Sequence, residues 1–216
     1  DLVLSWLIKH KVKTAIFTSS YAAKIIKDKL PEIEVFSVTE GIDSKNYPEG
    51  KVLSSRNIDF FEYGREVDNF IKIDLPPNIY QVHSKVNGKI VMSNETLKDT
   101  LINSKIVIAL PQCLTHPKIA GNIETLTQRY WECMLSRVVL VGHAPTELVN
   151  LLGYNPVIEI ERDDFNSQII NILKNINDYQ DFVDKNREMS LIYGDWKYSI
   201  KRVIRFLKSQ GYNVDI

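Results

Sequence analysis

The chain has 216 residues, 44% of them hydrophobic, so it can form one large domain or one domain plus part of another. Its 27 basic and 27 acidic side chains cancel, which argues against a global attraction to nucleic acid or to an anionic membrane. The two cysteines, Cys113 and Cys133, lie outside any metal-type cluster and fit a reducing compartment. No apolar run reaches the ~20 residues that a membrane-spanning helix needs, so we predict no transmembrane segment. Because the chain begins at Asp1 without methionine, we expect a fragment of a longer protein.

The first part of the chain is predicted to alternate between helices and strands and to end in a linker. We expect helices at 2–10 and 21–30 and strands at 13–18 and 33–38. Ser19 or Ser20 can cap the second helix, and Pro31 ends it. Residues 40–50 are rich in turn-forming side chains and read as a linker.

After the linker, short apolar strands alternate with amphipathic segments. We expect strands at 58–63, 79–83, 89–92, 106–110, 138–141 and 157–160, with a turn at Asn87–Gly88. We expect a short amphipathic segment at 66–73 and helices at 96–102 (capped by Ser93), 121–134, 145–152, 164–176, 179–190 and 196–209. This order predicts an α/β fold with a Rossmann-like, mostly parallel sheet that is flanked by helices.

Ligands of such sheets bind beyond the carboxyl ends of the strands. Four turns follow predicted strands and are expected to converge there: Gly64–Arg65, Met92–Ser93, 111–122 and Gly142–His143. These turns are therefore the first candidates for a binding site.

The predicted helix 121–134 carries Glu124 in its first turn and Glu132 about two turns later. The first turn also presents free backbone N–H groups, which bind phosphate readily. Trp131 and Met134 indicate that Glu132 is largely buried, where a ligand hydroxyl could be its partner. The alternative is structural: Glu124 would interact with the helix dipole, worth ~0.3–1 kcal/mol, and Glu132 would lie on an exposed face.

The order of features around these glutamates resembles the C-terminal donor domain of GT-B glycosyltransferases. That order is strand, loop, Glu-x7-Glu, aromatic-Glu-Cys-Met, β-branched strand and Gly-x-x-Pro-x-Glu-Leu. The group it resembles is the retaining one called glycosyl transferases group 1, which includes family 4. The resemblance runs from about Thr14 to the end of the chain. It implies that residues 1–45 are the tail of an N-terminal Rossmann-like domain and the hinge. Residues 46–192 would be the nucleotide-sugar-binding domain, and 193–216 a C-terminal helix that crosses back.

The same resemblance implies roles for individual residues. Glu124 would face the hydroxyls of the donor sugar, and Glu132 would accept hydrogen bonds from the ribose. Arg65 would neutralise charge on the leaving nucleoside diphosphate. The implied site comprises catalytic Glu124 and Arg65, backbone N–H groups of Thr125, Leu126 and Thr127 at the diphosphate, Met92 and Ser93 beside the base, and donor-binding Gly64, Asn122, Arg129 and Glu132.

The chain departs from the family pattern at two positions. Where many members have a glycine after the first glutamate, this chain has Leu126–Thr127. The second cation of the family, usually a lysine, has no match, because Lys72 is too far along the chain. Arg129 either replaces it or forms a structural ion pair.

Two histidines lie in turns near the predicted site, and no metal is expected there. His116 and His143 could reach the site, although a solvated or core-capping histidine is the more common role. No His/Cys/Asp spacing indicates a metal, and the family resemblance implies neither a metal nor another cofactor.

These features predict a retaining glycosyltransferase that takes a UDP-, GDP- or dTDP-sugar and a glycan or glycolipid acceptor, as in bacterial polysaccharide biosynthesis. The acceptor-binding N-terminal domain would be a missing partner, and nucleic acid would not be one. We expect a cytoplasmic protein, with peripheral association at the inner membrane face as a further expectation. The alternatives are a nucleotide-sugar epimerase on a related fold and a non-catalytic module that binds a nucleotide or a protein.

Overall fold

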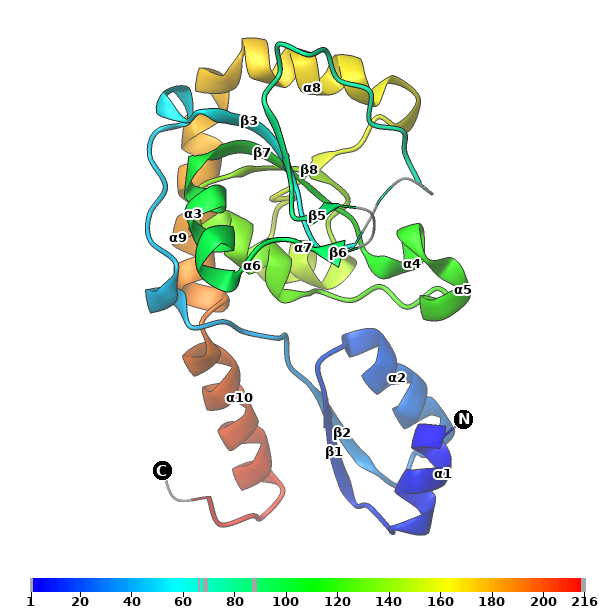
Figure 1. Ribbon diagram of the computed structural model, residues 1–216. Helices are drawn as coiled ribbons and strands as arrows, with labels where there is room; N and C mark the ends of the chain where they lie inside the picture. The colour runs from blue at the N-terminus through cyan, green and yellow to red at the C-terminus, as the bar shows by residue number, and fades with distance from the viewer. Residues whose placement is uncertain (1, 66, 68–69, 87–88, 215–216) are drawn as a thin grey trace.

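The computed structural model describes residues 2–65, 67, 70–86 and 89–214. Figure 1 shows two lobes: a larger one built on a five-stranded sheet, and a smaller one in which α1, α2 and α10 surround the β1–β2 pair. The expected turn Asn87–Gly88 and part of the expected segment 66–73 lie outside the described residues.

The sheet of the larger lobe has the order β4-β3-β7-β8-β9, and all its strands are parallel. Its strands are β3 (Ile58–Glu62), β4 (Gln81–His83), β7 (Ser104–Ala109), β8 (Val139–Gly142) and β9 (Ile158–Glu159). The central strands β7 and β8 are almost entirely buried, as expected for a parallel sheet that is covered on both faces. The predicted α/β class with a parallel sheet is confirmed.

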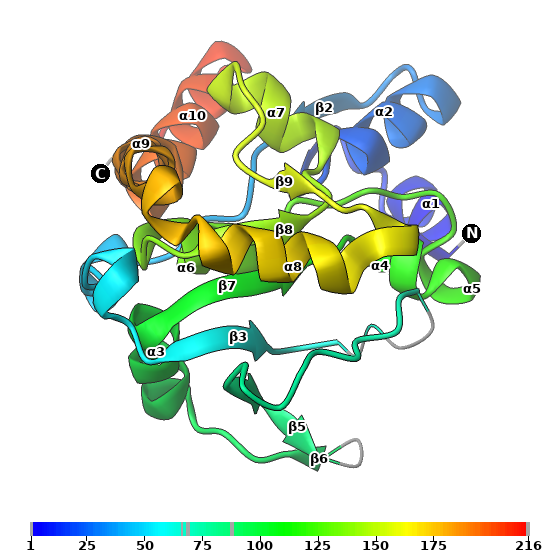
Figure 2. The ribbon, with the colours of Figure 1, turned by 90° about the horizontal axis from the view of Figure 1, so that it is seen from above.

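Successive side chains of β3 point to opposite faces of the sheet and so enter two separate cores. Phe61 packs with residues of α3 (Asn94–Asn103), α6 (Gln128–Leu135) and α7 (Thr146–Leu152). Its neighbour Phe60 packs on the other face, where Phe165 of α8 (Phe165–Lys174) meets it edge to face. Figure 2 shows α8 lying along the sheet and α9 (Gln180–Tyr193) at its end.

The expectation that Met92–Ser93 follows a strand of the main sheet is wrong. The strand that precedes it, β6 (Lys89–Ile90), pairs antiparallel with β5 (Lys85–Val86) in a separate two-stranded sheet. Two strands that follow each other so closely can only pair as an antiparallel hairpin, because a parallel pair requires a longer crossover connection. Ser93 does cap α3, since its hydroxyl accepts a hydrogen bond from the Thr96 backbone N–H.

The expected helix 121–134 is wrong at its beginning, because α6 starts only at Gln128. The preceding connection contains two short helices, α4 (Gln112–Thr115) and α5 (Pro117–Ala120), and then a non-helical loop. The loop is held away from helical geometry by a side chain of α7, as the Leu126 N–H donates to Glu147 Oε1 at 2.9 Å. Glu124 therefore lies in a loop and not in the first turn of a helix.

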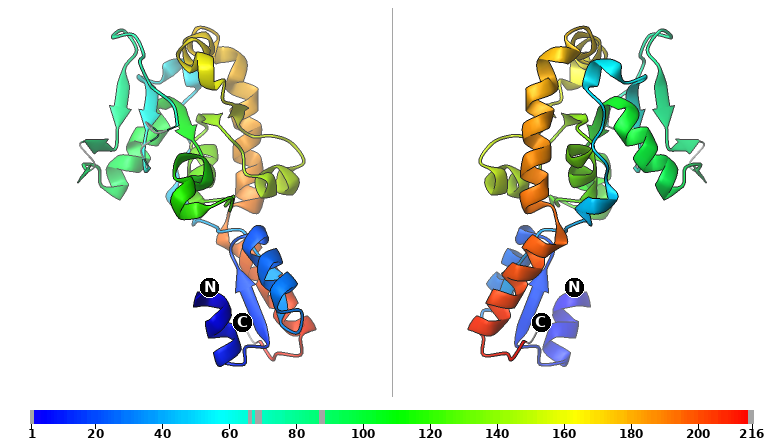
Figure 3. Two further views of the ribbon diagram at one scale, coloured as in Figure 1. Left: turned by 90° about the vertical axis from the view of Figure 1, so that its right-hand side faces the viewer. Right: turned by 90° about the vertical axis from the view of Figure 1, so that its left-hand side faces the viewer.

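The smaller lobe is built from both ends of the chain. Its elements are α1 (Leu2–Lys9), β1 (Thr14–Phe17), α2 (Ser20–Lys29), β2 (Glu34–Ser37) and α10 (Trp196–Ser209). Ser19 caps α2 as expected, and Phe206 of α10 stacks on Phe36 of β2 with ring centroids 4.7 Å apart. Figure 3 shows α10 continuing from the end of α9 and running beside β1 and β2.

The lobes are joined where the linker meets the start of α10. Backbone hydrogen bonds connect Ile42 to Gly194 and Trp196, and the Trp131 Nε1–H of α6 donates to the Glu40 carbonyl at 2.9 Å. Short 3₁₀ turns lie at Ser44–Asn46, Leu53–Ser55, Arg162–Asp164 and Ile176–Tyr179. The boundaries expected at residues 45 and 192 stay predictions.

Candidate functional site

Three of the four turns expected to converge lie side by side at the carboxyl edge of the sheet. Gly64–Arg65 follows β3, the loop from Pro111 follows β7, and Gly142–His143 lies at the end of β8, whose last residue is Gly142. Since β3, β7 and β8 are neighbouring parallel strands, their ends meet at one edge, and the His143 N–H donates to the Ala109 carbonyl there. The fourth turn, Met92–Ser93, follows the antiparallel hairpin instead.

Two arginines lie together at the end of β3. Gly64 has a φ of +85°, and a Cβ added to it would lie 1.8 Å from a guanidinium nitrogen of Arg129. The glycine thus allows the Arg129 side chain of α6 to cross the strand end, where its guanidinium lies 5.0 Å from the centroid of the Tyr63 ring. Burial, and then the positive charge of Arg129, lower the pKa of Arg65, although an arginine so shifted is still charged at neutral pH.

Neither arginine is neutralised within the part of the chain that the structure describes. No carboxylate there forms an ion pair with Arg65 or Arg129, and the buried Nε of Arg65 has no hydrogen-bond partner. Of the two roles predicted for Arg129, the structural ion pair thus receives no support from the described residues. Two adjacent guanidinium groups in such surroundings favour an anionic ligand with several oxygen atoms.

Glu132 lies in the second turn of α6, and two tyrosine hydroxyls hold its carboxylate. Tyr47 donates to Oε1 at 2.7 Å and Tyr63 to Oε2 at 2.9 Å. Burial and the hydrogen bond to Glu132 raise the pKa of Tyr47, and burial raises the pKa of Tyr63, so both hydroxyls stay protonated at neutral pH. A carboxylate offers about four acceptor positions, so Glu132 can accept further hydrogen bonds from a ligand.

A polar pocket of about 360 Å³ lies in front of this carboxylate, between the linker, α3 and α6. It is lined by Ile42, Asp43, Asn46, Tyr47, Asn94, Leu97, Lys98, Gln128, Glu132 and Trp196. Lys98 lies over the Tyr47 ring, 5.3 Å from its centroid. Neither Tyr47 nor Tyr63 was among the expected site residues. Tyr63 directly precedes Gly64–Arg65 and could have been inferred from that position, whereas nothing in the linker sequence indicates Tyr47.

Glu124 is bound by a histidine and by a backbone N–H group. Its Oε2 accepts the Thr146 N–H at 2.6 Å, and its Oε1 lies 2.9 Å from His143 Nε2. On the other side of the same imidazole, Nδ1 lies 2.7 Å from Oε1 of Glu159 in β9. Burial lowers the pKa of His143, but the hydrogen bonds and charges of Glu159 and Glu124 raise it more, so this pKa lies above its usual value.

The residues between Glu124 and α6 differ from the arrangement expected for a diphosphate site. Leu126 is fully buried, and its N–H group already donates to Glu147, so it is not free for a ligand. Thr127 occupies the N-cap position of α6 but makes no side-chain capping bond, which leaves the first N–H groups of this helix without a side-chain cap. Asn122 is exposed in the loop, and Thr125 is half-buried.

A contact between the lobes lies directly behind this loop. Glu147 Oε2 accepts hydrogen bonds from the backbone and the hydroxyl of Ser20 at the start of α2, at 3.1 and 2.8 Å. A pocket of about 290 Å³ lies there and is lined by Ser20, Ser37, Val38, Thr39, Glu147, Asn150, Leu151 and Arg202. The Glu124 loop is thus close to the junction of the two lobes.

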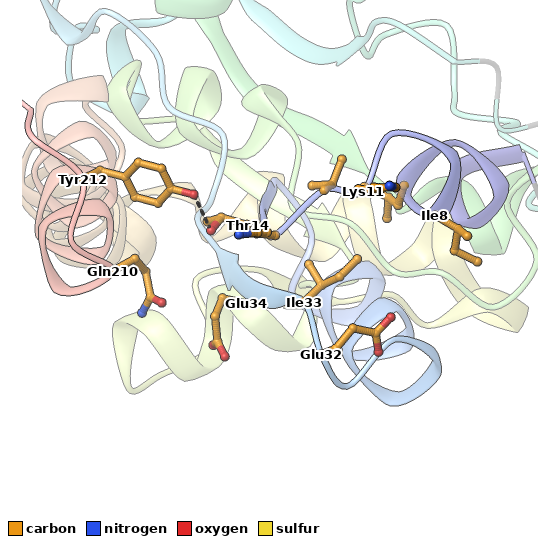
Figure 4. Close-up of a pocket in the computed structure, with 11 residues that line it drawn as sticks. Ile8, Lys11, Thr14, Glu32, Ile33, Glu34, Gln210 and Tyr212 are labelled. Carbon is orange, nitrogen blue, oxygen red and sulfur yellow. Dashed lines mark hydrogen bonds between the residues drawn. The ribbon is translucent and has the colours of Figure 1, made fainter.

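Two further pockets are lined by neither Glu124 nor Glu132. The pocket in Figure 4, about 620 Å³, includes Thr14, Glu34 and Tyr212, and the Thr14 and Tyr212 hydroxyls lie 2.9 Å apart. Because Thr14 and Glu34 begin β1 and β2, this pocket is at the amino ends of these strands, where α/β folds rarely bind ligands. A second, apolar pocket of about 600 Å³ lies beside α4 and α5.

The described ranges contain neither a cluster of metal ligands nor a helix that could cross a membrane. Across residues 2–65, 67, 70–86 and 89–214, no three side chains of His, Cys, Asp or Glu are grouped as metal ligands would be. Of the helices built from those residues, none has the length and apolar character to cross a membrane. The ring Nδ1 of His116, the other histidine expected near the site, lies 2.9 Å from the Thr115 hydroxyl, and His116 lines the apolar pocket beside α4 and α5.

Comparison with known proteins gives matches in structure but not in sequence. No protein-family model matches the chain, and no curated protein matches it. The sucrose-phosphate synthase from Thermosynechococcus elongatus superposes on 91% of the chain with a TM-score of 0.59 and 9% identity. TarM superposes on 91% of it with a TM-score of 0.58 and 12% identity.

The chain spans only part of both neighbours, 58% of the synthase and 43% of TarM. Both are GT-B glycosyltransferases, and at this low identity the likeness concerns the fold. The chain therefore has a fold like that of the C-terminal part of GT-B glycosyltransferases.

Proposed function

We propose that the chain is the donor-binding part of a retaining glycosyltransferase that transfers a sugar from a nucleotide-sugar to a glycan or glycolipid acceptor. The observation that carries this proposal is the arginine pair at the end of β3. Arg65 and Arg129 lie together without a described carboxylate partner, and the start of α6 beside them has no side-chain cap. Guanidinium groups and helical N–H groups together bind a diphosphate well.

Glu132 supports the nucleotide part of the proposal. Its carboxylate is oriented by two neutral hydroxyls and borders a polar pocket, and it retains free acceptor positions for a ribose diol. Tyr47 and Lys98 on the same pocket provide a ring and a cation beside which a base could lie. The base, whether uracil, guanine or thymine, is left to experiment.

Glu124 and the arginines would then share the chemical step. As the bond between the sugar and the diphosphate breaks, negative charge grows on the leaving phosphate, and Arg65 and Arg129 would stabilise it. Glu124, held at the edge of the sheet by Thr146 and His143, would accept hydrogen bonds from the sugar hydroxyls. The acceptor and its binding domain, the cytoplasmic location and the association with the inner membrane face stay predictions.

Calorimetric titration with UDP, GDP and dTDP tests the nucleotide site. We expect one diphosphate to bind, and Arg65→Ala and Arg129→Ala each to weaken binding about 10- to 100-fold, the loss expected for a hydrogen bond to a charged group. Arg205→Ala, on the exposed side of α10, is the matched control and should bind as the wild type does. A folded wild-type sample that binds none of the three would overturn the proposal.

Transfer from labelled nucleotide-sugars separates the transferase from the alternatives. If the sugar is released to water or to an acceptor, and this release depends on Glu124, the chain is supported as a transferase. A nucleotide-sugar product that differs from the starting nucleotide-sugar at one stereocentre of the sugar indicates an epimerase. Diphosphate binding without turnover, unchanged in Glu124→Ala, would indicate a non-catalytic module.

A further inference from the structure

His143 is placed so that both ring nitrogens face carboxylates. Nε2 lies 2.9 Å from Glu124 Oε1, which comes from the loop before α6. Nδ1 lies 2.7 Å from Glu159 Oε1, which comes from the edge strand β9. The backbone of His143 is fixed as well, because its N–H donates to Ala109 and its carbonyl accepts the Tyr130 hydroxyl at 2.7 Å.

A neutral imidazole has one N–H donor and one nitrogen lone pair, whereas an imidazolium has two donors. A lone pair that faced a carboxylate oxygen at either of these distances would be repelled. Both contacts are therefore favourable together only when both nitrogens carry protons, or when one of the carboxyl groups is protonated. With Glu159 exposed and Glu124 accepting a backbone N–H as well, the imidazolium is the consistent assignment.

We propose that His143 is a positioning residue: a doubly protonated imidazole that ties Glu124 to Glu159 and so fixes the Glu124 carboxylate at the edge of the sheet. The link to catalysis rests on the proposed function, whereas the protonation state does not. His143 itself need not touch the substrate. Its effect on the reaction would pass through the orientation of Glu124.

Other titratable groups lie near the cluster formed by Glu124, His143 and Glu159. Cys113 of α4, Tyr130 of α6 and Arg65 after β3 all lie within electrostatic range of it, since Glu124 raises the pKa values of Cys113 and Tyr130 and Arg65 lowers them. Burial is the largest cause of the raised pKa of both groups, so neither is ionised at neutral pH. The charges that act on the pKa of His143 are thus the two carboxylates of Glu159 and Glu124.

The consequence is a loss of order around Glu124 at alkaline pH. Because the pKa of His143 is raised, the imidazolium persists to a higher pH than that of an ordinary histidine and is lost as the pH rises through the raised value. Above it, one proton remains for two carboxylates, so one of the two contacts breaks. In the tautomer whose proton faces Glu159, the Thr146 N–H is the remaining partner of Glu124 among the described residues, so averaged over both tautomers the Glu124 orientation toward a donor sugar is less defined.

Nitrogen-15 NMR of the imidazole rings tests the protonation state directly. We expect both His143 nitrogens to be protonated at pH 7, with a titration midpoint above ~6.5, the value of an unperturbed histidine. His143→Asn identifies the signals, and Glu159→Gln should move the midpoint to lower pH. Glu161→Gln removes an exposed carboxylate two residues away and should leave the midpoint in place. A single protonated nitrogen at pH 7, or a midpoint insensitive to Glu159→Gln, would overturn the inference whether or not the chain binds nucleotides.

Kinetics then test the positioning role. For an active enzyme, Glu159→Gln should move the alkaline limb of kcat to lower pH while the affinity for the nucleoside diphosphate stays that of the wild type. Glu161→Gln should keep the wild-type profile. An alkaline limb that Glu159→Gln does not move would show that His143 does not position Glu124 for the reaction, and diphosphate binding in the same samples would show that the proposed function stands independently.

Discussion

Glu124 and Glu132 are eight residues apart, yet their carboxylates lie in two chemically different regions. Glu132 is part of a helix and is held by the hydroxyls of Tyr47 and Tyr63, which stay neutral at any ordinary pH. Glu124 belongs to a loop and is held by a backbone N–H and by a histidine that titrates. The two hydroxyls that hold Glu132 thus keep their protons as the pH rises, whereas the proposed imidazolium that holds Glu124 loses one.

The two regions also depend on different parts of the fold. Helix α6 fixes the position of Glu132, because the two residues that follow it in the helix, Cys133 and Met134, are fully buried. Glu124 depends on how its loop is anchored, and the main anchor is Leu126, which is buried and bound through its N–H to Glu147. Substitutions can therefore disturb one carboxylate and leave the other in place.

Leu126→Ala should have the largest effect on stability. Leu126 is fully buried, and truncating such a leucine costs about 2–5 kcal/mol, because it removes apolar contacts and leaves a cavity. The free energy of unfolding from urea denaturation measures this loss. Ile119→Ala in the same connection is the matched control, since Ile119 is 75% exposed and should change stability by less than about 0.5 kcal/mol. Equal losses in the two variants would contradict the anchoring role of Leu126.

Glu132→Ala should rank next, and it acts on the other region. It leaves the Tyr47 and Tyr63 hydroxyls without their acceptor, and the Tyr63 hydroxyl is buried, with only the Cys133 sulfur and the Arg129 carbonyl as longer contacts. Losing hydrogen bonds to a charged acceptor costs about 1.5–3 kcal/mol, measurable by denaturation, and nucleotide affinity should fall with it. Glu188→Ala, at an exposed position of α9, controls for the loss of a helical glutamate. Unchanged stability would show that the two hydroxyls do not depend on Glu132.

Gly64→Ala should cost about 1–2 kcal/mol, because the φ of +85° is unfavourable for alanine and the new Cβ collides with Arg129. Gly153→Ala is a close control: its φ is +75°, but a Cβ there meets nothing within 4 Å. Both variants should lose stability, but only Gly64→Ala should weaken diphosphate binding, since only it displaces Arg129. Calorimetry measures the affinity of both variants for the nucleoside diphosphate. Equal affinities would show that Arg129 does not bind the diphosphate.

The sequence predicts the fold well where its elements are strongly periodic. The apolar strands at β3, β7 and β8 and the helix 196–209 were expected close to their observed positions, because a buried parallel strand and an amphipathic helix each leave a local pattern. The carboxyl edge of the sheet as the location of the candidate site follows from the same patterns. The GT-B fold that the motif around Glu124 and Glu132 suggested is confirmed by the structural neighbours.

What the sequence did not predict depends on contacts between distant residues. The late start of α6 results from the Leu126–Glu147 hydrogen bond, which joins positions 21 residues apart. Tyr47 reaches Glu132 across 85 positions, and Glu159 faces His143 only because β8 and β9 are paired. The expectation at Met92–Ser93 was wrong because a strand signal alone does not distinguish a hairpin from a member of the parallel sheet.

The smallest expected effect is a pH dependence of stability that belongs to His143. Because the pKa of His143 is raised in the folded chain, its imidazolium stabilises the fold fully below the unfolded value of about 6.5, and this contribution is lost as pH rises through the folded value. The cluster is partly exposed, so a contribution of about 0.3–0.5 kcal/mol is expected, or about 1 °C in Tm. The difference in Tm between wild type and His143→Asn should therefore be larger at pH 6 than at pH 9. Tyr47→Phe removes a neutral donor from Glu132, so its difference in Tm from the wild type should be the same at both pH values. If the difference in Tm from the wild type changed with pH for Tyr47→Phe and not for His143→Asn, the group that titrates would lie beside Glu132 and not beside Glu124.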